Sequence, residues 1–161
     1  ETLVEYTIPS RNPNWSDCEG IEYCGVAQVF DFAIDGKKIW FTEWVENNIG
    51  VVDTSIPLPF SIDIDTQSII LKKGQTANVL LYVIPTSDLV GDITVNSSTT
   101  SLFSDIVVTS EPNELYLDDV SKTISIQITA SENALSGTHK VLLGMYNNDI
   151  AISQFITVTI V

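Results

Sequence analysis

The amino-acid sequence predicts an all-β protein, for three reasons. No segment longer than about a dozen residues has its apolar residues at helical spacing. Apolar and polar residues instead alternate along most of the chain. Turn-forming pairs such as Lys73-Gly74 and Ser136-Gly137 interrupt this alternation at short intervals. Alternating segments separated by turns are typical of antiparallel β-sheets.

Residues 64–161 predict a β-sandwich. Between Lys122 and Ala130 three isoleucines occupy alternate positions, and residues 156–160 repeat the pattern with Thr157 and Thr159 on the outer side. Residues 77–85 are apolar on both faces, which favours a central strand that is covered on both sides. Roughly seven or eight such strands in about a hundred residues are typical of two packed antiparallel sheets.

The segment Ala134–Tyr146 resembles the small-x-x-Gly-Thr-Tyr-x-Val stretch that begins a late strand in many immunoglobulin-like and fibronectin-like modules. The resemblance implies a corner at 133–137 and inward-facing Val141 and Leu143. His139 occupies the position where those modules often carry tyrosine. We therefore expect His139, the only histidine, to be a corner or surface residue and not a catalytic one.

Residues 1–63 differ from the rest because they contain all three tryptophans and both cysteines. The runs "VFDFAIDG", "KKIWFTEW", "NNIGVVDTS" and "LPFSID" predict four short antiparallel strands with turns at Asp35-Gly36 and Asn47-Asn48. A four-stranded meander with an aromatic motif is the unit of a β-propeller blade. We therefore expect a propeller-blade-like segment at 1–63, with a cysteine-containing loop, followed by an immunoglobulin-like sandwich.

The spacing of Asp35-Gly36, Ile39–Glu43 and Asn48–Gly50 resembles the repeat of streptogramin (virginiamycin B) lyase-like propellers. The resemblance covers residues 3–63, which are one repeat and the end of another at Leu3–Ser10. A propeller needs at least four blades. The resemblance thus implies that this segment is the C-terminal end of a longer propeller.

The lyases of that family use a histidine base in a Pro-His-Gly-Ile segment, with a metal ion nearby. Here the corresponding segment, 24–28, reads "CGVAQ" and has no histidine. Glu43 and Glu46 match or neighbour the acidic position of the motif, and both are also explained as a blade-edge turn or an exposed pair. We assign no catalytic residue and no cofactor, because shared folds do not imply shared chemistry.

The composition restricts the partners. The chain has 161 residues, of which 44% are hydrophobic, with 21 acidic and 7 basic residues and a net charge of −14. This charge repels nucleic acids and anionic bilayers, so we expect neither as a partner. The sequence contains no run of 18 apolar residues, so it predicts no membrane-spanning segment. The chain begins at Glu1 without methionine, which suggests a processed protein or a fragment.

Cys18 and Cys24 are separated by five residues. This spacing is not that of a zinc or redox motif, so we expect a disulfide, with free buried thiols or a metal ligand pair as alternatives. A disulfide indicates an extracellular compartment. The glycosylation sequons at Asn14 and Asn96 agree with that location.

Two acidic pairs are weaker candidates. Asp63 and Asp65 share one face of an expected strand, and Asp118 and Asp119 lie in an expected turn. Calcium needs six to eight converging oxygens, so solvated carboxylates explain both pairs better. We assign no metal site to either.

The sequence therefore favours a non-catalytic extracellular or cell-surface module for spacing, adhesion or binding, whose ligand it does not identify. The apolar faces and strand edges of an isolated blade need cover, so we expect the blade to pack on the sandwich. Self-association is the alternative, either by packing of two blades or by exchange of the N-terminal strand, residues 3–8, between copies. One alternative is the C-terminal part of a streptogramin-lyase-like enzyme. A second is a carbohydrate-binding sandwich, which would carry exposed aromatic residues on one sheet face. The sequence does not show whether Phe103, Tyr116, Tyr146 and Phe155 share a face.

Overall fold

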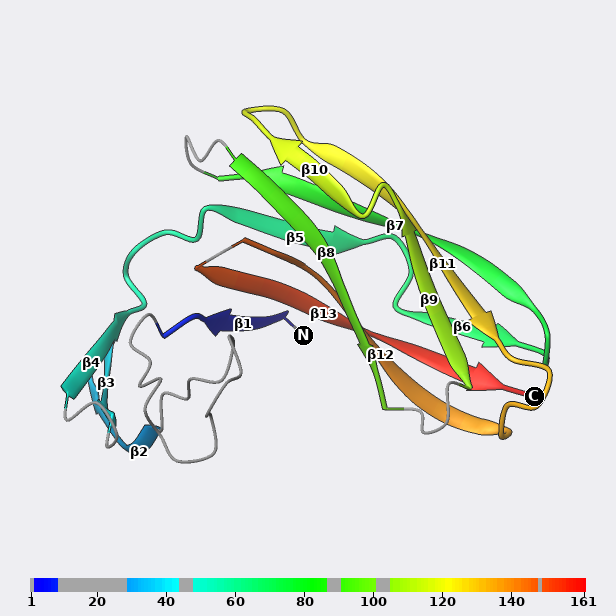
Figure 1. Ribbon diagram of the computed structural model, residues 1–161, viewed down its shortest axis with the longest axis horizontal. Helices are drawn as coiled ribbons and strands as arrows, with labels where there is room; N and C mark the ends of the chain where they lie inside the picture. The colour runs from blue at the N-terminus through cyan, green and yellow to red at the C-terminus, as the bar shows by residue number, and fades with distance from the viewer. Residues whose placement is uncertain (1, 9–28, 44–47, 87–90, 101–104, 148) are drawn as a thin grey trace, which may run out of the picture. The chain divides into compact units, whose positions relative to one another are not determined.

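The computed structural model describes residues 2–8, 29–43, 48–86, 91–100, 105–147 and 149–161. It confirms the all-β prediction, because every regular element in these ranges is a strand (Figure 1). No helix in the described part of the chain is long and apolar enough to span a membrane. The chain forms two compact units, one comprising Glu1–Glu5 and Leu58–Val161 and the other Tyr6–Pro57.

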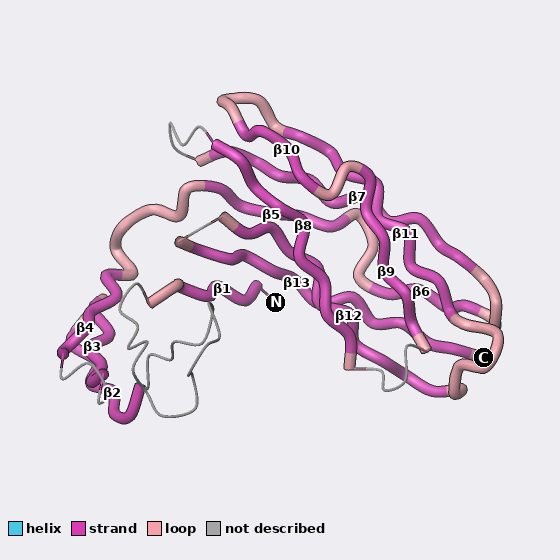
Figure 2. Tube along the Cα trace, in the orientation of Figure 1, coloured by secondary structure: helices cyan, strands magenta, loops and turns pink. Residues whose placement is uncertain are grey.

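The larger unit is a β-sandwich of two sheets, shown as a tube in Figure 2. The first sheet has the order β1-β13-β12-β8-β10, and β6 pairs in parallel with β13. The second has the order β5-β7-β11-β9. The strands of the first sheet are β1 (Thr2–Tyr6), β6 (Ser68–Leu71), β8 (Gly91–Thr99), β10 (Glu114–Leu117), β12 (Gly137–Tyr146) and β13 (Ile150–Ile160). Those of the second sheet are β5 (Phe60–Ile64), β7 (Thr76–Pro85), β9 (Ile106–Glu111) and β11 (Lys122–Ala130).

The alternating pattern of the sequence places one side of each sheet in the core. The three isoleucines of β11 are fully buried, as are Val141 and Leu143 of β12. The same alternation buries Ile156 and Val158 of β13 and leaves its threonines half-buried on the outer side. The inward and outward residues of these three strands thus follow the sequence prediction.

Strand β7 is central, as expected, but it is covered on one side only. Val79, Leu81 and Val83 are fully buried, whereas Leu80 and Ile84 on the other face are exposed. The apolar outer residues reflect the strand preference for branched side chains on a pleated surface, and no second layer covers them within the described residues. The expectation of a doubly covered strand was therefore wrong.

The smaller unit contains a three-stranded antiparallel meander, β2-β3-β4. Its strands are β2 (Val29–Asp35), β3 (Lys38–Glu43) and β4 (Asn48–Asp53). Gly36 closes the β2–β3 turn with a φ of 60°, a left-handed conformation that glycine adopts without strain. The predicted turn at Asn47-Asn48 lies partly outside the described residues.

The structure differs from the prediction at both ends of this segment. The fourth expected strand is β5, which pairs with β7 and buries Phe60 and Ile62 in the sandwich core. The expected end of a preceding repeat is β1, which pairs with β13. Both strands lie in the sandwich because their apolar residues complete its core, into which Val4 also packs. In the described residues the meander has three strands.

Candidate functional site

The meander carries apolar side chains on both of its faces. Cross-strand partners lie on the same face of a sheet, so the pairing of Phe41 with Phe32 and Gly50 defines one face. The pairing of Trp40 with Ala33 and Val51 defines the other. The exposed large apolar residues of the meander are Phe30, Phe32, Ile34, Trp40, Ile49 and Val51. The described strands of the meander therefore bury neither face fully.

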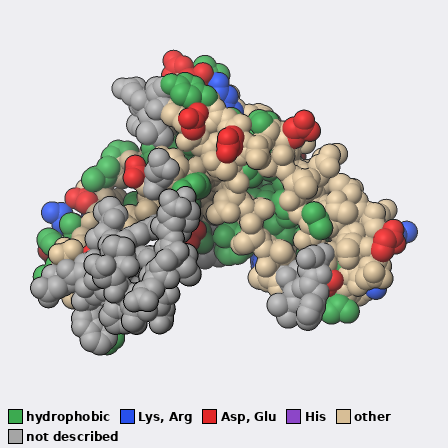
Figure 3. Space-filling model, in the orientation of Figure 1, with side chains coloured by type: hydrophobic (Ala, Val, Ile, Leu, Met, Phe, Trp, Pro, Cys, Tyr) green, Lys and Arg blue, Asp and Glu red, His purple; other side chains and the backbone are tan. Residues whose placement is uncertain are grey.

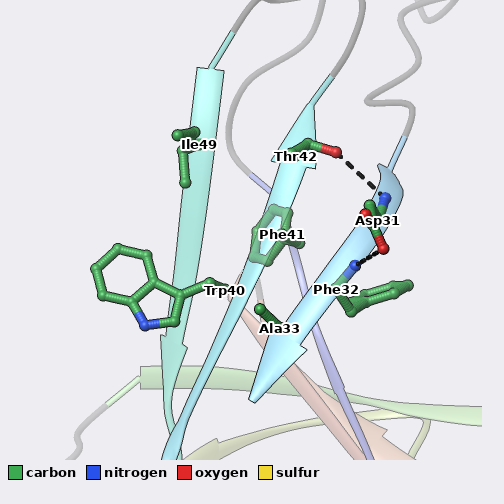
Figure 4. Close-up of a pocket in the computed structure, with 7 residues that line it drawn as sticks. All are labelled: Asp31, Phe32, Ala33, Trp40, Phe41, Thr42 and Ile49. Atoms are coloured by element: carbon green, nitrogen blue, oxygen red, sulfur yellow. Dashed lines mark hydrogen bonds between the residues drawn. The ribbon is translucent and has the colours of Figure 1, made fainter. Parts of the chain in front are cut away.

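A shallow pocket of about 110 Å³ lies on the meander. Figure 4 shows its lining, which combines the aromatic residues Phe32, Trp40 and Phe41 with Ala33, Ile49, Thr42 and Asp31. The register of β2 shifts between Val29 and Phe32. Within this irregular stretch the backbone amide of Asp31 donates to Oγ1 of Thr42 at 3.2 Å, and the amide of Phe32 donates to Oδ1 of Asp31 at 2.8 Å. The pocket is thus mainly apolar, with one anchored carboxylate at its edge.

The aromatic ring of Phe41 on β3 packs closely over Gly50 on β4. A Cβ at position 50 would lie 2.3 Å from Cζ of Phe41, so the ring lies directly over Gly50. Glycine in a strand often marks a close approach of this kind. Gly50, the glycine of the motif, therefore has a packing role in this sequence.

The candidate residues of the lyase-like motif have different outcomes. Glu43 ends β3, where it pairs with Val29 and Asn48, and it is only 5% exposed. The explanation of Glu43 as a member of an exposed pair was therefore wrong, because its side chain is buried. Glu46 and the segment 24–28 lie outside the described residues, as do Cys18, Cys24 and Asn14. The disulfide and the first sequon remain predictions.

His139 lies at the start of β12, where the resemblance to immunoglobulin-like modules places it. Its ring is half-buried, and Nε2 lies 3.3 Å from the carbonyl oxygen of Leu135, to which it donates. In a tyrosine corner a hydroxyl makes the same kind of bond to the backbone a few residues upstream. Asp105 supports the same corner by accepting from the backbone amide of Leu135 at 3.1 Å. These contacts indicate a structural role for His139.

The two acidic pairs bond to nearby backbone and lysine groups. Asp65 accepts from the amide of Leu80 at 3.0 Å, which fastens the end of β5 to β7. Asp118 lies 2.8 Å from Nζ of Lys122, whose hydrogen bond is the main cause that lowers the pKa of this carboxyl. Within the described ranges, no group of three or more histidine, cysteine or acidic side chains could hold a metal ion.

Asn96 lies on β8 and is exposed. Its cross-strand partner on β12 is Gly144, which has no side chain to crowd it. The sequon at Asn96 is therefore accessible in the folded sandwich. Glycosylation of Asn96 remains a prediction.

No protein-family model matches the chain. No curated protein matches it either. Several solved structures resemble it in fold. Domains 4 and 5 of the S-layer protein SbsC align over 77% of this chain and 65% of that one, with a TM-score of 0.48 and 12% identity. A family 123 glycoside hydrolase from Clostridium perfringens aligns over 63% of this chain and 27% of its own, with a TM-score of 0.52 and 11% identity.

A Salmonella alpha-2-macroglobulin aligns over 76% of this chain and 8% of its own, with a TM-score of 0.50 and 13% identity. The chain thus spans between 8% and 65% of the length of these three proteins. At such low identity the likeness concerns the fold alone. The likenesses to the glycoside hydrolase and to the macroglobulin agree with a β-sandwich and assign no activity.

Proposed function

We propose that this chain is a non-catalytic extracellular or cell-surface module that acts by association through its meander. The observation that carries the proposal is the apolar character of both meander faces, where Phe32 and Ile34 lie on one face and Ile49 and Val51 on the other. Leaving about 400 Å² of such surface in water costs on the order of 10 kcal/mol. A surface of this kind is typical of a sheet that packs against further sheets.

The spacing of the D-G, W-F-T-E and N-x-I-G residues supports a propeller-like repeat as the origin of the meander. In a propeller, each blade covers the faces of its neighbours. A second copy of this chain would supply a matching apolar face, so we propose self-association as the default in solution. The two predicted sequons and the predicted disulfide support the extracellular location.

Light scattering over a range of concentrations tests the association. The expected result is a mass that rises above that of one chain and returns to it in the variants Phe32→Ser and Ile49→Ser, which make the two faces polar. Val107→Ser, on the outer side of β9 in the sandwich, is the control and should associate as the parent does. A parent chain that stays monomeric, with Phe32 and Ile49 accessible to solvent, would contradict the proposal.

An assay of lyase and hydrolase turnover tests the non-catalytic part. The expected result is no turnover above background, because 24–28 lacks the histidine base of the lyases and a base must lie within reach of the proton that it removes. Turnover that disappears in the variant Glu43→Gln would show that the lyase-like alternative is correct.

A further inference from the structure

Three exposed aromatic side chains lie on one face of the sandwich. On β12, Val141, Leu143 and Met145 point into the core, so Tyr146 points outward. The partner of Leu142, also outward, is Phe155 of β13. The exposed fractions of Tyr116, Tyr146 and Phe155 are 57%, 41% and 38%.

Tyr116 of β10 belongs to the same face. Tyr146 pairs with Thr94 of β8, and Thr94 pairs with Glu114 of β10. Tyr116 is two residues beyond Glu114 and pairs with Asp92. Because residues two apart in a strand share a face, Tyr116 lies on the outer face with Tyr146. We call the three residues Tyr116, Tyr146 and Phe155 the aromatic stripe.

The stripe crosses four neighbouring strands diagonally. Strand spacing and rise place the Cα atoms of Tyr116 and Tyr146 about 12 Å apart, and those of Tyr146 and Phe155 about 14 Å apart. A ligand that consists of one small ring cannot contact side chains this far apart. A ligand that uses the whole stripe must therefore be extended.

A row of polar side chains on β8 lies between the two tyrosines. Asp92 and Thr94 flank the core residue Ile93 of this strand and share the outer face. Among the residues that the structure describes, no hydrogen bond to these two side chains is found. Their carboxylate and hydroxyl groups are thus available to a ligand that lies across β8.

We propose that this face binds an extended, neutral polysaccharide of pyranose units. Pyranose rings present C–H groups on their faces and hydroxyls at their rims. The faces of tyrosine and phenylalanine rings offer apolar area with a partial negative charge, which suits the C–H groups. The hydroxyls match the polar row of β8, as in sites where a few polar groups orient a ligand on an apolar surface.

Charge excludes anionic polysaccharides. The chain carries a net charge of −14, and Asp92 and Glu114 lie beside the stripe. In Figure 3 acidic side chains are spread over the visible surface, and basic ones are few. Anionic chains would be repelled. This proposal does not depend on the association of the meander, since none of the three aromatic residues belongs to it.

Titration calorimetry of the full chain with cellohexaose and chitohexaose tests the proposal, with polygalacturonate as the anionic probe. We expect binding of at least one neutral hexasaccharide and none of polygalacturonate. Tyr146→Ala should weaken binding by at least about tenfold, because this ring is central in the stripe and aromatic side chains dominate such contacts. Tyr146→Phe keeps the ring and should bind within about threefold of the parent.

Val107→Ala removes an exposed apolar side chain from the other sheet and is the matched control, with binding unchanged. Circular dichroism of each variant verifies that the sandwich is folded. The proposal is overturned if the parent binds neither hexasaccharide, if Val107→Ala weakens binding as much as Tyr146→Ala does, or if polygalacturonate binds more tightly. Because the meander is unchanged in all these variants, its association is measured independently by light scattering.

Discussion

The sandwich and the meander use similar strand sequences to opposite effect. In the sandwich, apolar residues on one side of each strand meet those of a facing sheet, and residues such as Ile124 and Leu143 are fully buried. In the meander, both sides of the strands are apolar, and Ile34 and Ile49 are among the most exposed large side chains. The comparison shows that a strand pattern stabilises a unit only where a second layer covers it.

The largest expected difference between the two regions concerns truncation of an isoleucine. Ile126→Ala should lower the free energy of unfolding of the sandwich by about 2–5 kcal/mol, because Ile126 is fully buried and its removal leaves a cavity. Ile49→Ala, at a residue that is 73% exposed, should change stability by less than about 0.5 kcal/mol.

Urea denaturation followed by far-UV circular dichroism measures both effects. A loss in Ile49→Ala as large as that in Ile126→Ala would mean that the meander has a core of its own. It would then have no need of a partner surface.

The next effect concerns the cysteines of the first segment. If Cys18 and Cys24 form a disulfide, a closed loop of seven residues contributes about 2.4 kcal/mol by restricting the unfolded chain. Replacement of both cysteines by serine should lower the free energy of unfolding of residues 1–63, which contain the tryptophans, by this amount. Mass spectrometry after alkylation without reductant identifies the bond, and two alkylated thiols would remove the argument for a secreted protein.

A smaller effect tests the contact of Phe41 with Gly50. Gly50→Ala should destabilise the meander by about 1–3 kcal/mol, because the added Cβ would overlap the Phe41 ring and force it to move. All three tryptophans lie in residues 1–63, so tryptophan fluorescence follows this region selectively.

Gly91→Ala is the control, because a Cβ at position 91 meets nothing within 4 Å. Its fluorescence transition should coincide with that of the parent chain. An unchanged transition in Gly50→Ala would show that the ring lies elsewhere in solution.

Much of the sandwich could be predicted from the sequence, because alternation is a local signal. In β11 and β13 each inward residue follows from its neighbours two positions away. The corner near His139 was expected from the resemblance of residues 134–146 to immunoglobulin-like modules, and its hydrogen bond is also local, since it reaches only four residues back, to Leu135.

The remaining features depend on pairing between distant segments, which no local pattern contains. The apolar run of β5 fits a fourth meander strand as well as a sandwich edge, and its pairing with β7 decides the outcome. The aromatic stripe also requires the registers of β10, β8, β12 and β13 together. One-residue shifts in any of these registers would move Tyr116 or Phe155 to another face.

The smallest expected effect compares one carboxylate in each region at low pH. In the sandwich, the hydrogen bond from Lys122 is the main cause that lowers the pKa of Asp118. In the meander, hydrogen bonds from the Ser55 hydroxyl and amide lower the pKa of Asp53. A carboxyl group whose folded-state pKa lies below the usual 3.8 stabilises the fold at pH values above 3.8. This stability is lost as the pH falls through the folded-state pKa.

Unfolding midpoints measured between about pH 5 and pH 2 therefore fall with acid in the parent chain, and part of that fall should disappear in Asp118→Asn and in Asp53→Asn. The Asp118 carboxylate is exposed, so salt screens the Asp118–Lys122 pair, and the contribution of Asp118 should shrink at high ionic strength. Asp53 should be less sensitive to salt, because its first partner is a neutral hydroxyl.

The two probes distinguish the two regions. Asp118→Asn should shift the unfolding transition that circular dichroism follows, and Asp53→Asn should shift the transition that tryptophan fluorescence follows. If each variant instead shifts both transitions equally, the two units unfold together, and the meander draws its stability from the sandwich.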